Sequence, residues 1–166
     1  MANDINITYK LRLMEKQDAF EIGKWKYEPP YSLYNSSDDQ ESLEELLDGS
    51  YYAVITPEYG LTGFFCYGRN AQVPGGVKQG LYTGDNVLDI GLGLKPEYTG
   101  TGLGKGFLQA GIQFAESVFT PEKFRLTVAA FNQRAIALYS HAGFRTLGSF
   151  IKINGESQME FLVMER

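Results

Sequence analysis

The N-terminal half of the chain alternates between short apolar stretches and polar segments with a helical period. Apolar and polar residues alternate in ITYKLRLM, which is typical of a half-buried strand. Leu43, Leu46 and Leu47 share one face of a helix, which Ser37 or Asp38 is expected to cap and Gly49 to end. The pattern predicts strands at residues 7–14, 51–56 and 61–68 and helices at residues 15–27 and 38–49.

The rest of the chain contains the longest expected loop, at residues 69–86, and the longest helical pattern. Strands are predicted at residues 87–95, 124–131, 144–153 and 158–165, and helices at residues 102–119 and 132–143. A helix between two strands usually crosses between parallel neighbours. We therefore expect one α/β domain over residues 1–166, with a mixed sheet of about six to seven strands and about four flanking helices.

Composition narrows the class of protein. The chain has 166 residues, 43% of them hydrophobic, and a net charge of -5. No run of Lys and Arg suggests a nucleic-acid footprint, and no window approaches the roughly 20 apolar residues of a membrane span. With Cys66 as the single cysteine, no internal disulfide can form. The N-terminus does not look like a signal peptide, so we expect a cytoplasmic protein that binds neither nucleic acid nor membrane.

A glycine-rich stretch, YTGTGLGKGF, joins the strand at residues 87–95 to the longest helix. Glycines at alternate positions allow backbone N–H groups to converge on one point. At a helix N-terminus these donors add to the positive end of the helix dipole. The stretch therefore predicts a binding site for a phosphorylated cofactor, although glycines that only permit tight packing are an alternative.

Two common phosphate-binding patterns do not fit this stretch. The dinucleotide pattern G-x-G-x-x-G would need glycine at position 105 or 107, where the chain has Lys105 and Phe107. The Walker pattern needs Ser or Thr after Gly-Lys, and here Gly106 follows Lys105. His141 is the single histidine, so we expect no metal site.

Two longer motifs resemble those of the Gcn5-related N-acetyltransferase (GNAT) superfamily. LGLKPEYTGTGLGKGFL is similar to motif A of the family, and NQRAIALYSHAGF is similar to motif B. They occur in the family's order, about thirty residues apart, and the resemblance extends over roughly residues 8 to 165. The chain departs from the family at Thr99, where Arg or Gln is usual, so weaker cofactor binding is expected.

The resemblance implies acetyl-CoA as the cosubstrate. In the family, the pantetheine arm lies beside the glycine-containing strand, where missing side chains would let it approach, and a backbone N–H polarises the thioester carbonyl. Asn132 matches a cofactor-contacting residue, although an Asn here could also be a plain helix N-cap. The matching cofactor residues are Leu92, Gly93, Leu94, Thr99, Gly100, Thr101, Gly102, Leu103, Gly104, Lys105 and Asn132.

The resemblance also implies an acid, and it leaves the base open. Tyr139 matches the tyrosine that protonates the leaving thiolate, for which a phenol of pKa about 10 is suitable. A tyrosine packed on the core is the alternative. Asp89 is the candidate base, because it matches a position where some branches of the family often carry Glu. It shares strand parity with Gly91 and Gly93, although it could instead be an edge or solvent-facing residue. Glu28 and a water chain are further candidates, whereas the next strand offers Thr127 and no carboxylate.

The acceptor site is expected near the loop YEPPYSLYN. Glu28, Tyr31 and Tyr34, with Tyr27 and Trp25, could shape an amine pocket, or they could simply pin a surface loop by aromatic packing. A second wall is expected from residues 72–80 and the C-terminal strands.

Taken together, the motifs predict an acyltransferase that moves an acetyl group to a primary amine by direct attack in a ternary complex. The amine could belong to a small molecule or to a protein. The alternative is a CoA-binding module of the same fold with weak or no catalysis. Homodimers are common in the family, and nothing in this sequence demands one.

Overall fold

The computed structural model describes residues 7–166, and it shows seven strands, five α-helices and three short 3-10 helices there. The strands are β1 (Lys10–Leu13), β2 (Tyr51–Thr56), β3 (Gly60–Tyr67), β4 (Val87–Leu94), β5 (Lys123–Ala129), β6 (Arg145–Asn154) and β7 (Ser157–Glu165). The helices are α1 (Lys16–Ile22), α2 (Gln40–Leu46), α3 (Pro74–Lys78), α4 (Gly104–Phe119) and α5 (Gln133–His141), with 3-10 turns at Tyr31–Tyr34, Arg69–Ala71 and Pro96–Tyr98.

The strands form one mixed sheet in the order β1-β2-β3-β4-β5-β7-β6. β4 and β5 are parallel, with Asp89 opposite Arg125. The pairs β1–β2, β5–β7 and β6–β7 are antiparallel. The expected α/β fold with a mixed sheet is confirmed.

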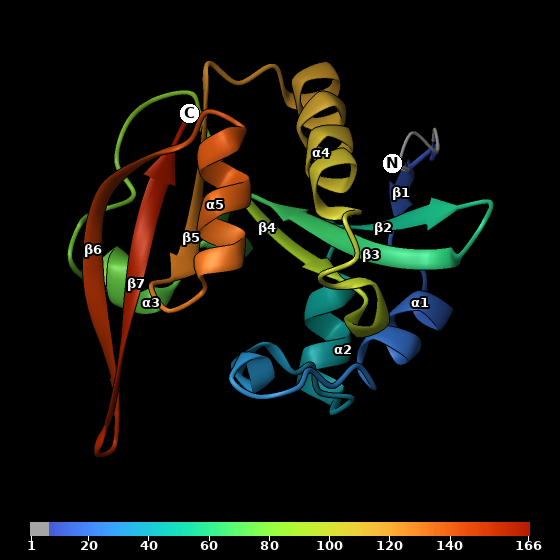
Figure 1. Ribbon diagram of the computed structural model, residues 1–166, viewed down its shortest axis with the longest axis horizontal. Coiled ribbons are helices and arrows are strands. Elements are labelled where there is room, and N and C mark those ends of the chain that lie inside the picture. The colour runs from blue at the N-terminus through green and yellow to red at the C-terminus, as the bar shows by residue number, and fades with distance from the viewer. Residues whose placement is uncertain (1–6) are drawn as a thin grey trace. The chain divides into compact units, whose positions relative to one another are not determined.

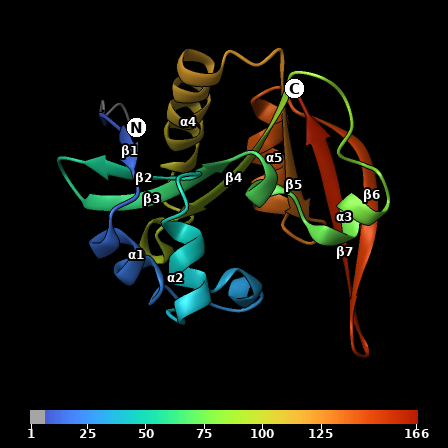
Figure 2. The ribbon, with the colours of Figure 1, turned by 180° about the vertical axis from the view of Figure 1, so that it is seen from behind.

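Contacts within the chain divide it into two compact units. The first comprises the chain up to Phe65 together with Leu92–Phe114. Within it, α4 covers one face of the β1–β3 strands, and α1 and α2 lie on the other face (Figures 1 and 2). The neighbouring residues Phe64 and Phe65 point to opposite faces, as strand geometry requires. Phe65 stacks on Phe107 of α4 with ring centroids 4.7 Å apart, and Phe64 stacks on Trp25 at 6.2 Å.

The second unit comprises Cys66–Gly91 and Ala115–Arg166. Helix α5 lies on one face of strands β5, β7 and β6, and α3 lies on the other (Figures 1 and 2). The α3 face buries Phe150 and Phe161, whose rings stack with centroids 5.5 Å apart. Val73, Leu81 and Tyr82 pack against this cluster from the segment around α3. That segment is therefore anchored to the sheet by apolar contacts.

Several local details differ from the sequence-based expectation. The side chain of Asp39, and not that of Ser37 or Asp38, caps α2 by accepting from the Ser42 N–H at 2.8 Å. The predicted helix at residues 15–27 ends at Ile22. The expected loop at residues 69–86 contains α3, whose first residue is Pro74. Proline suits a helix start because its missing N–H would have no acceptor there.

Candidate active site

The predicted cofactor strand and glycine loop both belong to the first unit. Leu92, Gly93 and Leu94 end β4, and Pro96–Tyr98 form a 3-10 turn before the loop. A Cβ placed on Gly93 would overlap the ring of Phe64. This changes the expected reason for the glycine: on that side of the strand, the missing side chain makes room for Phe64 and not for a ligand.

The glycine loop has the backbone geometry that its sequence suggests. Gly100 and Gly102 have φ values of 72° and 88°, a left-handed region that favours glycine. A Cβ on Gly102 would meet no heavy atom within 4 Å, so open space surrounds this position. Residues 100–102 are exposed. The loop therefore presents accessible backbone with no side chain in front of it.

The two threonines of the loop bond to the turn that precedes it. The Thr99 hydroxyl donates to the Pro96 carbonyl at 2.8 Å, and the Thr101 hydroxyl donates to the Tyr98 carbonyl. Thr99, the residue at which the chain differs from the family motif, thus stabilises the turn. It has no charge with which to hold a phosphate.

Helix α4 begins at Gly104, directly after this loop. The N–H groups of its first turn have no acceptor within the helix, and the helix dipole places partial positive charge there. Lys105 is exposed in the same turn. Loop and helix together form an arrangement that can bind a phosphate or pyrophosphate.

The aromatic loop after α1 is fixed at its base. The Trp25 carbonyl accepts from the Ser36 N–H at 3.3 Å, and the Tyr27 N–H donates to Asn35 Oδ1 at 2.5 Å. The Tyr27 hydroxyl donates to the Leu94 carbonyl at 2.7 Å, and burial raises the pKa of that phenol. The structure thus brings this loop to the end of the predicted cofactor strand.

The predicted acceptor residues lie farther along this loop. Glu28 is exposed and its carbonyl accepts from the Tyr31 N–H at 2.8 Å. Tyr31 is half-buried, whereas Tyr34 is exposed, and both belong to a 3-10 turn. Trp25 does not line an open surface, because it is only 5% exposed and stacks on Phe64.

Tyr139 and Asn132 lie on and before α5 in the second unit. Asn132 is the N-cap, and its Oδ1 accepts from the Ala135 N–H at 3.1 Å. The alternative role expected for Asn132, a helix N-cap, is therefore present. Tyr139 is 8% exposed and its ring meets Phe144 edge-on with centroids 6.1 Å apart.

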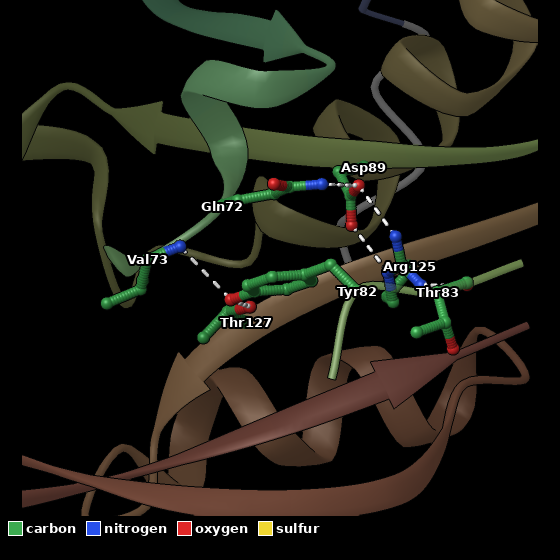
Figure 3. A network of polar contacts seen from close by, with 7 residues as sticks. All are labelled: Gln72, Val73, Tyr82, Thr83, Asp89, Arg125 and Thr127. Carbon is green, nitrogen blue, oxygen red and sulfur yellow. Dashed lines mark hydrogen bonds and ion pairs between the residues drawn. The ribbon is translucent and has the colours of Figure 1, made fainter. Parts of the chain in front are cut away.

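Asp89, also in the second unit, is not at a solvent-facing edge, because it is 5% exposed. Its Oδ1 accepts from Arg125 Nε at 2.6 Å, and its Oδ2 accepts from Arg125 Nη2 at 2.9 Å. Gln72 Nε2 donates to the same Oδ2 at 2.8 Å (Figure 3). These hydrogen bonds join the Asp89 carboxylate to Arg125 and Gln72.

Sequence reasoning missed the partners of Asp89. Arg125 and Asp89 have opposite charges and occupy paired positions on two parallel strands. That pairing was not visible in either segment alone, because it depends on the register of β4 against β5. Gln72 and Tyr82 come from the expected loop, where no periodic pattern marks a contact.

Two classes of site find no support in the described residues. Over residues 7–166, no helix is both long and apolar enough to cross a membrane. The same part of the chain holds no group of three or more His, Cys, Asp or Glu residues that could bind a metal ion.

Comparisons with known proteins agree with this fold. Residues 16–144 match the model of the acetyltransferase (GNAT) family. No curated protein matches the chain significantly. Among solved structures, a spermidine N-acetyltransferase SpeG chimera from Vibrio cholerae and hSSAT is similar, with 20% identity, a TM-score of 0.72, and coverage of 95% of this chain and 93% of that one.

Two further solved structures are similar. A GNAT-family acetyltransferase from Bacillus anthracis has 16% identity and a TM-score of 0.72, with 95% of this chain and 93% of that chain covered. One from Streptococcus pneumoniae has 19% identity and a TM-score of 0.67, with coverage of 96% and 98%. At these identities the structures establish the fold, while the family model covers most of the sequence. The chain therefore belongs to the acetyltransferase (GNAT) family and is an acyltransferase enzyme.

Proposed function

We propose that this enzyme transfers the acetyl group of acetyl-CoA to a primary amine in a ternary complex. The observation that carries the proposal is the loop at Gly100 and Gly102, which combines positive φ, open space and the N-terminus of α4. Backbone N–H groups in such a loop suit the pyrophosphate of CoA. In this proposal, residues 99–105 hold the pyrophosphate, and Leu92, Gly93 and Leu94 run beside the pantetheine arm, with Asn132 as a further cofactor contact.

The proposed reaction is a direct displacement at the thioester carbonyl. The cationic acceptor first gives one proton to the base or to water. The free amine nitrogen then bonds to the carbonyl carbon and loses a second proton, and the carbon–sulfur bond breaks with its electron pair leaving on sulfur. The CoA thiolate takes one proton from the phenol of Tyr139, a group of suitable acidity. The products are the acetylated amine and CoA.

Two carboxylates are candidates for the base that takes the proton of the amine. Asp89 is the sequence-based candidate, but its carboxylate is buried and already accepts three hydrogen bonds. Glu28 is exposed on the loop that carries Tyr31 and Tyr34. Exposure makes Glu28 available to an amine and to water, so it is the better candidate on geometry.

The acceptor is proposed to be an amine that is cationic in solution. An exposed carboxylate, Glu28, and two tyrosines on the same loop suit a cation, through charge and through the faces of the aromatic rings. One similar structure is named as a spermidine N-acetyltransferase. We therefore place polyamines first in an acceptor panel, followed by a lysine peptide and a peptide with a free N-terminus.

The first test is a calorimetric titration with acetyl-CoA, with ATP and NAD as controls on the same preparation. Micromolar binding of acetyl-CoA alone, about -8 kcal/mol, would support the cofactor proposal. Release of CoA with one amine of the panel would then support transfer. Binding of all three ligands equally, or of none, would contradict the proposal.

A CoA-binding module without catalysis is the competing function. Thr99 favours this alternative, because it carries no charge and its hydroxyl already donates to the Pro96 carbonyl. Such a module would bind acetyl-CoA but release no CoA with any amine. The same preparation therefore separates the two functions.

A further inference from the structure

The ion pair between Asp89 and Arg125 is one of the most deeply buried polar features of the second unit. Asp89 is 5% exposed and Arg125 is 3% exposed. They occupy paired positions on β4 and β5, and two hydrogen bonds join the carboxylate to the guanidinium. This fork-shaped contact fixes the orientation of both groups as well as their separation.

The pair also holds both ends of one segment, Gln72–Thr83, which contains α3. At its start, Gln72 Nε2 donates to Asp89 Oδ2. At its end, Arg125 Nη1 donates to the Thr83 carbonyl at 2.7 Å. Figure 3 shows these groups converging on the carboxylate and the guanidinium. A single ion pair thus fastens two points of the chain that are eleven positions apart in sequence.

Tyr82, near the end of the segment, is hydrogen-bonded to its start. Its ring lies against the guanidinium, with the Arg125 Cζ 5.1 Å from the ring centroid. Its hydroxyl accepts from the Val73 N–H at 3.0 Å and shares a hydrogen bond of 2.7 Å with the Thr127 hydroxyl (Figure 3). The start and the end of the segment are therefore joined to each other and to β5.

Between these fixed ends, the segment packs tightly on the C-terminal strands. A Cβ on Gly76 would come within 2.9 Å of the Phe150 ring and 2.8 Å of the Tyr82 ring. Apart from Gly76, which is buried, the residues from Pro74 to Gly80 are exposed or half-exposed. The segment thus presents an outer surface on a base that cannot shift without breaking buried polar contacts.

The charged and titratable groups that face Arg125 come from three elements. Hydrogen bonding to Asp89 raises the pKa of Arg125, burial opposes this, and the charges of Asp89, Glu165 on β7 and Tyr82 raise it further. Arg125 therefore stays charged over any practical pH range. The guanidinium is therefore not a pH switch.

We propose that Asp89 is a positioning residue: with Arg125 and Gln72 it holds the segment Gln72–Thr83 in place on the C-terminal strands, and it does not take the proton of the amine. The inference rests on the proposed function for the reaction in which that proton is lost. A base needs an oxygen that the amine can reach, and this carboxylate is enclosed by two side chains that already donate to it. Buried ionic groups of this kind contribute most clearly to fixing one arrangement of the chain.

The most informative variant is Gln72→Met, because it frees one end of the segment and leaves the ion pair intact. We expect it to loosen the segment, so that the amides there exchange about three- to tenfold faster, with acetyl-CoA affinity nearly unchanged. Tyr82→Phe, which loses two hydrogen bonds and keeps the ring, should act in the same direction. Gln113→Met, at an exposed position of α4, is the matched control.

The pH profile of Asp89→Asn separates positioning from proton transfer. If Asp89 only positions the segment, the acidic limb of the pH profile of kcat/KM should keep its shape in this variant. Loss of that limb would assign the proton to Asp89 and overturn the proposal. Arg125→Lys should loosen the segment less than Arg125→Gln does, because the positive charge beside Asp89 remains.

Amide hydrogen exchange tests the link without any assay of activity. In Gln72→Met and Tyr82→Phe, the amides of Val73 and of residues 76–81 should exchange faster than in the wild type, while β1 and β2 stay unchanged. Unchanged exchange in this segment would overturn the positioning role even if acetyl transfer is established. Conversely, if the wild type neither binds acetyl-CoA nor releases CoA, the proposed function fails while the exchange result still stands.

Discussion

At the scale of single residues, Tyr139 is the side chain on which the proposed chemistry depends most directly. Tyr139→Phe keeps the ring that packs against Phe144 and removes only the hydroxyl. Loss of a general acid typically slows the chemical step by about 10²- to 10⁴-fold. We expect kcat to fall in that range, measured as CoA release, with acetyl-CoA affinity unchanged in the calorimeter.

The matched control for this variant is Tyr59→Phe, because Tyr59 is 40% exposed and contacts the ring of Tyr98. Its activity should equal that of the wild type. Full activity in Tyr139→Phe would mean that water or another group protonates the thiolate. Loss of acetyl-CoA binding would instead give the Tyr139 hydroxyl a role in holding the cofactor.

Tyr27 provides a prediction about pH and stability. Burial raises the pKa of its phenol above the ordinary value of about 10. The folded protein therefore holds this proton more tightly than the unfolded chain, so its contribution to stability is complete below about pH 10 and is lost as pH rises. Between about pH 9 and about pH 11, the free energy of unfolding should fall more in the wild type than in Tyr27→Phe, as measured by urea denaturation.

The half-buried phenol of Tyr9 shifts in the same sense, but it does not affect this comparison. Burial also raises the pKa of Tyr9, and that residue is present in both proteins, so its effect cancels in the difference. Tyr34→Phe, at an exposed position, serves as the control and should behave as the wild type does. If the free energy of unfolding falls equally at alkaline pH in the wild type and in Tyr27→Phe, the Tyr27 phenol ionises as freely in the folded state as in the unfolded one.

At the scale of elements, the glycine loop can be tested by comparing two alanine variants, one in the loop and one at a glycine of similar conformation outside the candidate site. Gly102 has φ 88° and Gly49 has φ 99°, and a Cβ at either position would meet no heavy atom within 4 Å. Alanine at each position therefore costs only backbone strain, about 1–2 kcal/mol of stability. We expect Gly102→Ala alone to lose acetyl-CoA affinity, by about tenfold or 1.4 kcal/mol, because strain there moves the N–H donors of the loop.

Both variants are to be measured by urea denaturation and by calorimetric titration. Similar losses of stability with a selective loss of affinity in Gly102→Ala would support the pyrophosphate assignment. If the two variants bind acetyl-CoA equally well, the loop does not hold the cofactor. Equal loss of affinity in both would point to a general effect of stability on binding.

Elements with strong local patterns were predictable, and those with weak patterns were not. The strands and the long helix follow apolar periods, whereas α3 has five residues and includes Gly75 and Gly76, which disfavour a helix by about 1 kcal/mol each. Its stability comes from contacts with Phe150 and Tyr82, which the sequence does not show. The cap of α2 was misplaced because Ser37, Asp38 and Asp39 are all good cap residues and stand in a row.

At the scale of the whole molecule, features of the candidate site that depend on local sequence could be predicted, and those that depend on long-range contacts could not. The glycine loop could be found in the sequence because a positive φ is a requirement on the residue itself. The Asp89–Arg125 pair joins residues 36 positions apart and exists only through the register of two strands. Asp89 therefore looked like a free carboxylate in the sequence, and only its neighbours in the fold indicate that it positions a segment of the chain.

Ligand binding should also be visible in the stability of the whole enzyme. A ligand that binds only the folded state adds RT ln(1 + [L]/Kd), about 2.7 kcal/mol at a concentration 100 times Kd. For a chain of this length, that corresponds to a rise of roughly 5–10 °C in Tm. Acetyl-CoA should produce this rise in the wild type and in Tyr139→Phe, because the proposed acid acts after the cofactor is bound, but a smaller one in Gly102→Ala. ATP and NAD at the same concentration should produce no rise in Tm, since the cofactor proposal requires contacts along the pantetheine arm as well as the pyrophosphate. An equal rise in Tm with all three ligands would mean that the loop binds phosphate groups in general and is not specific for acetyl-CoA.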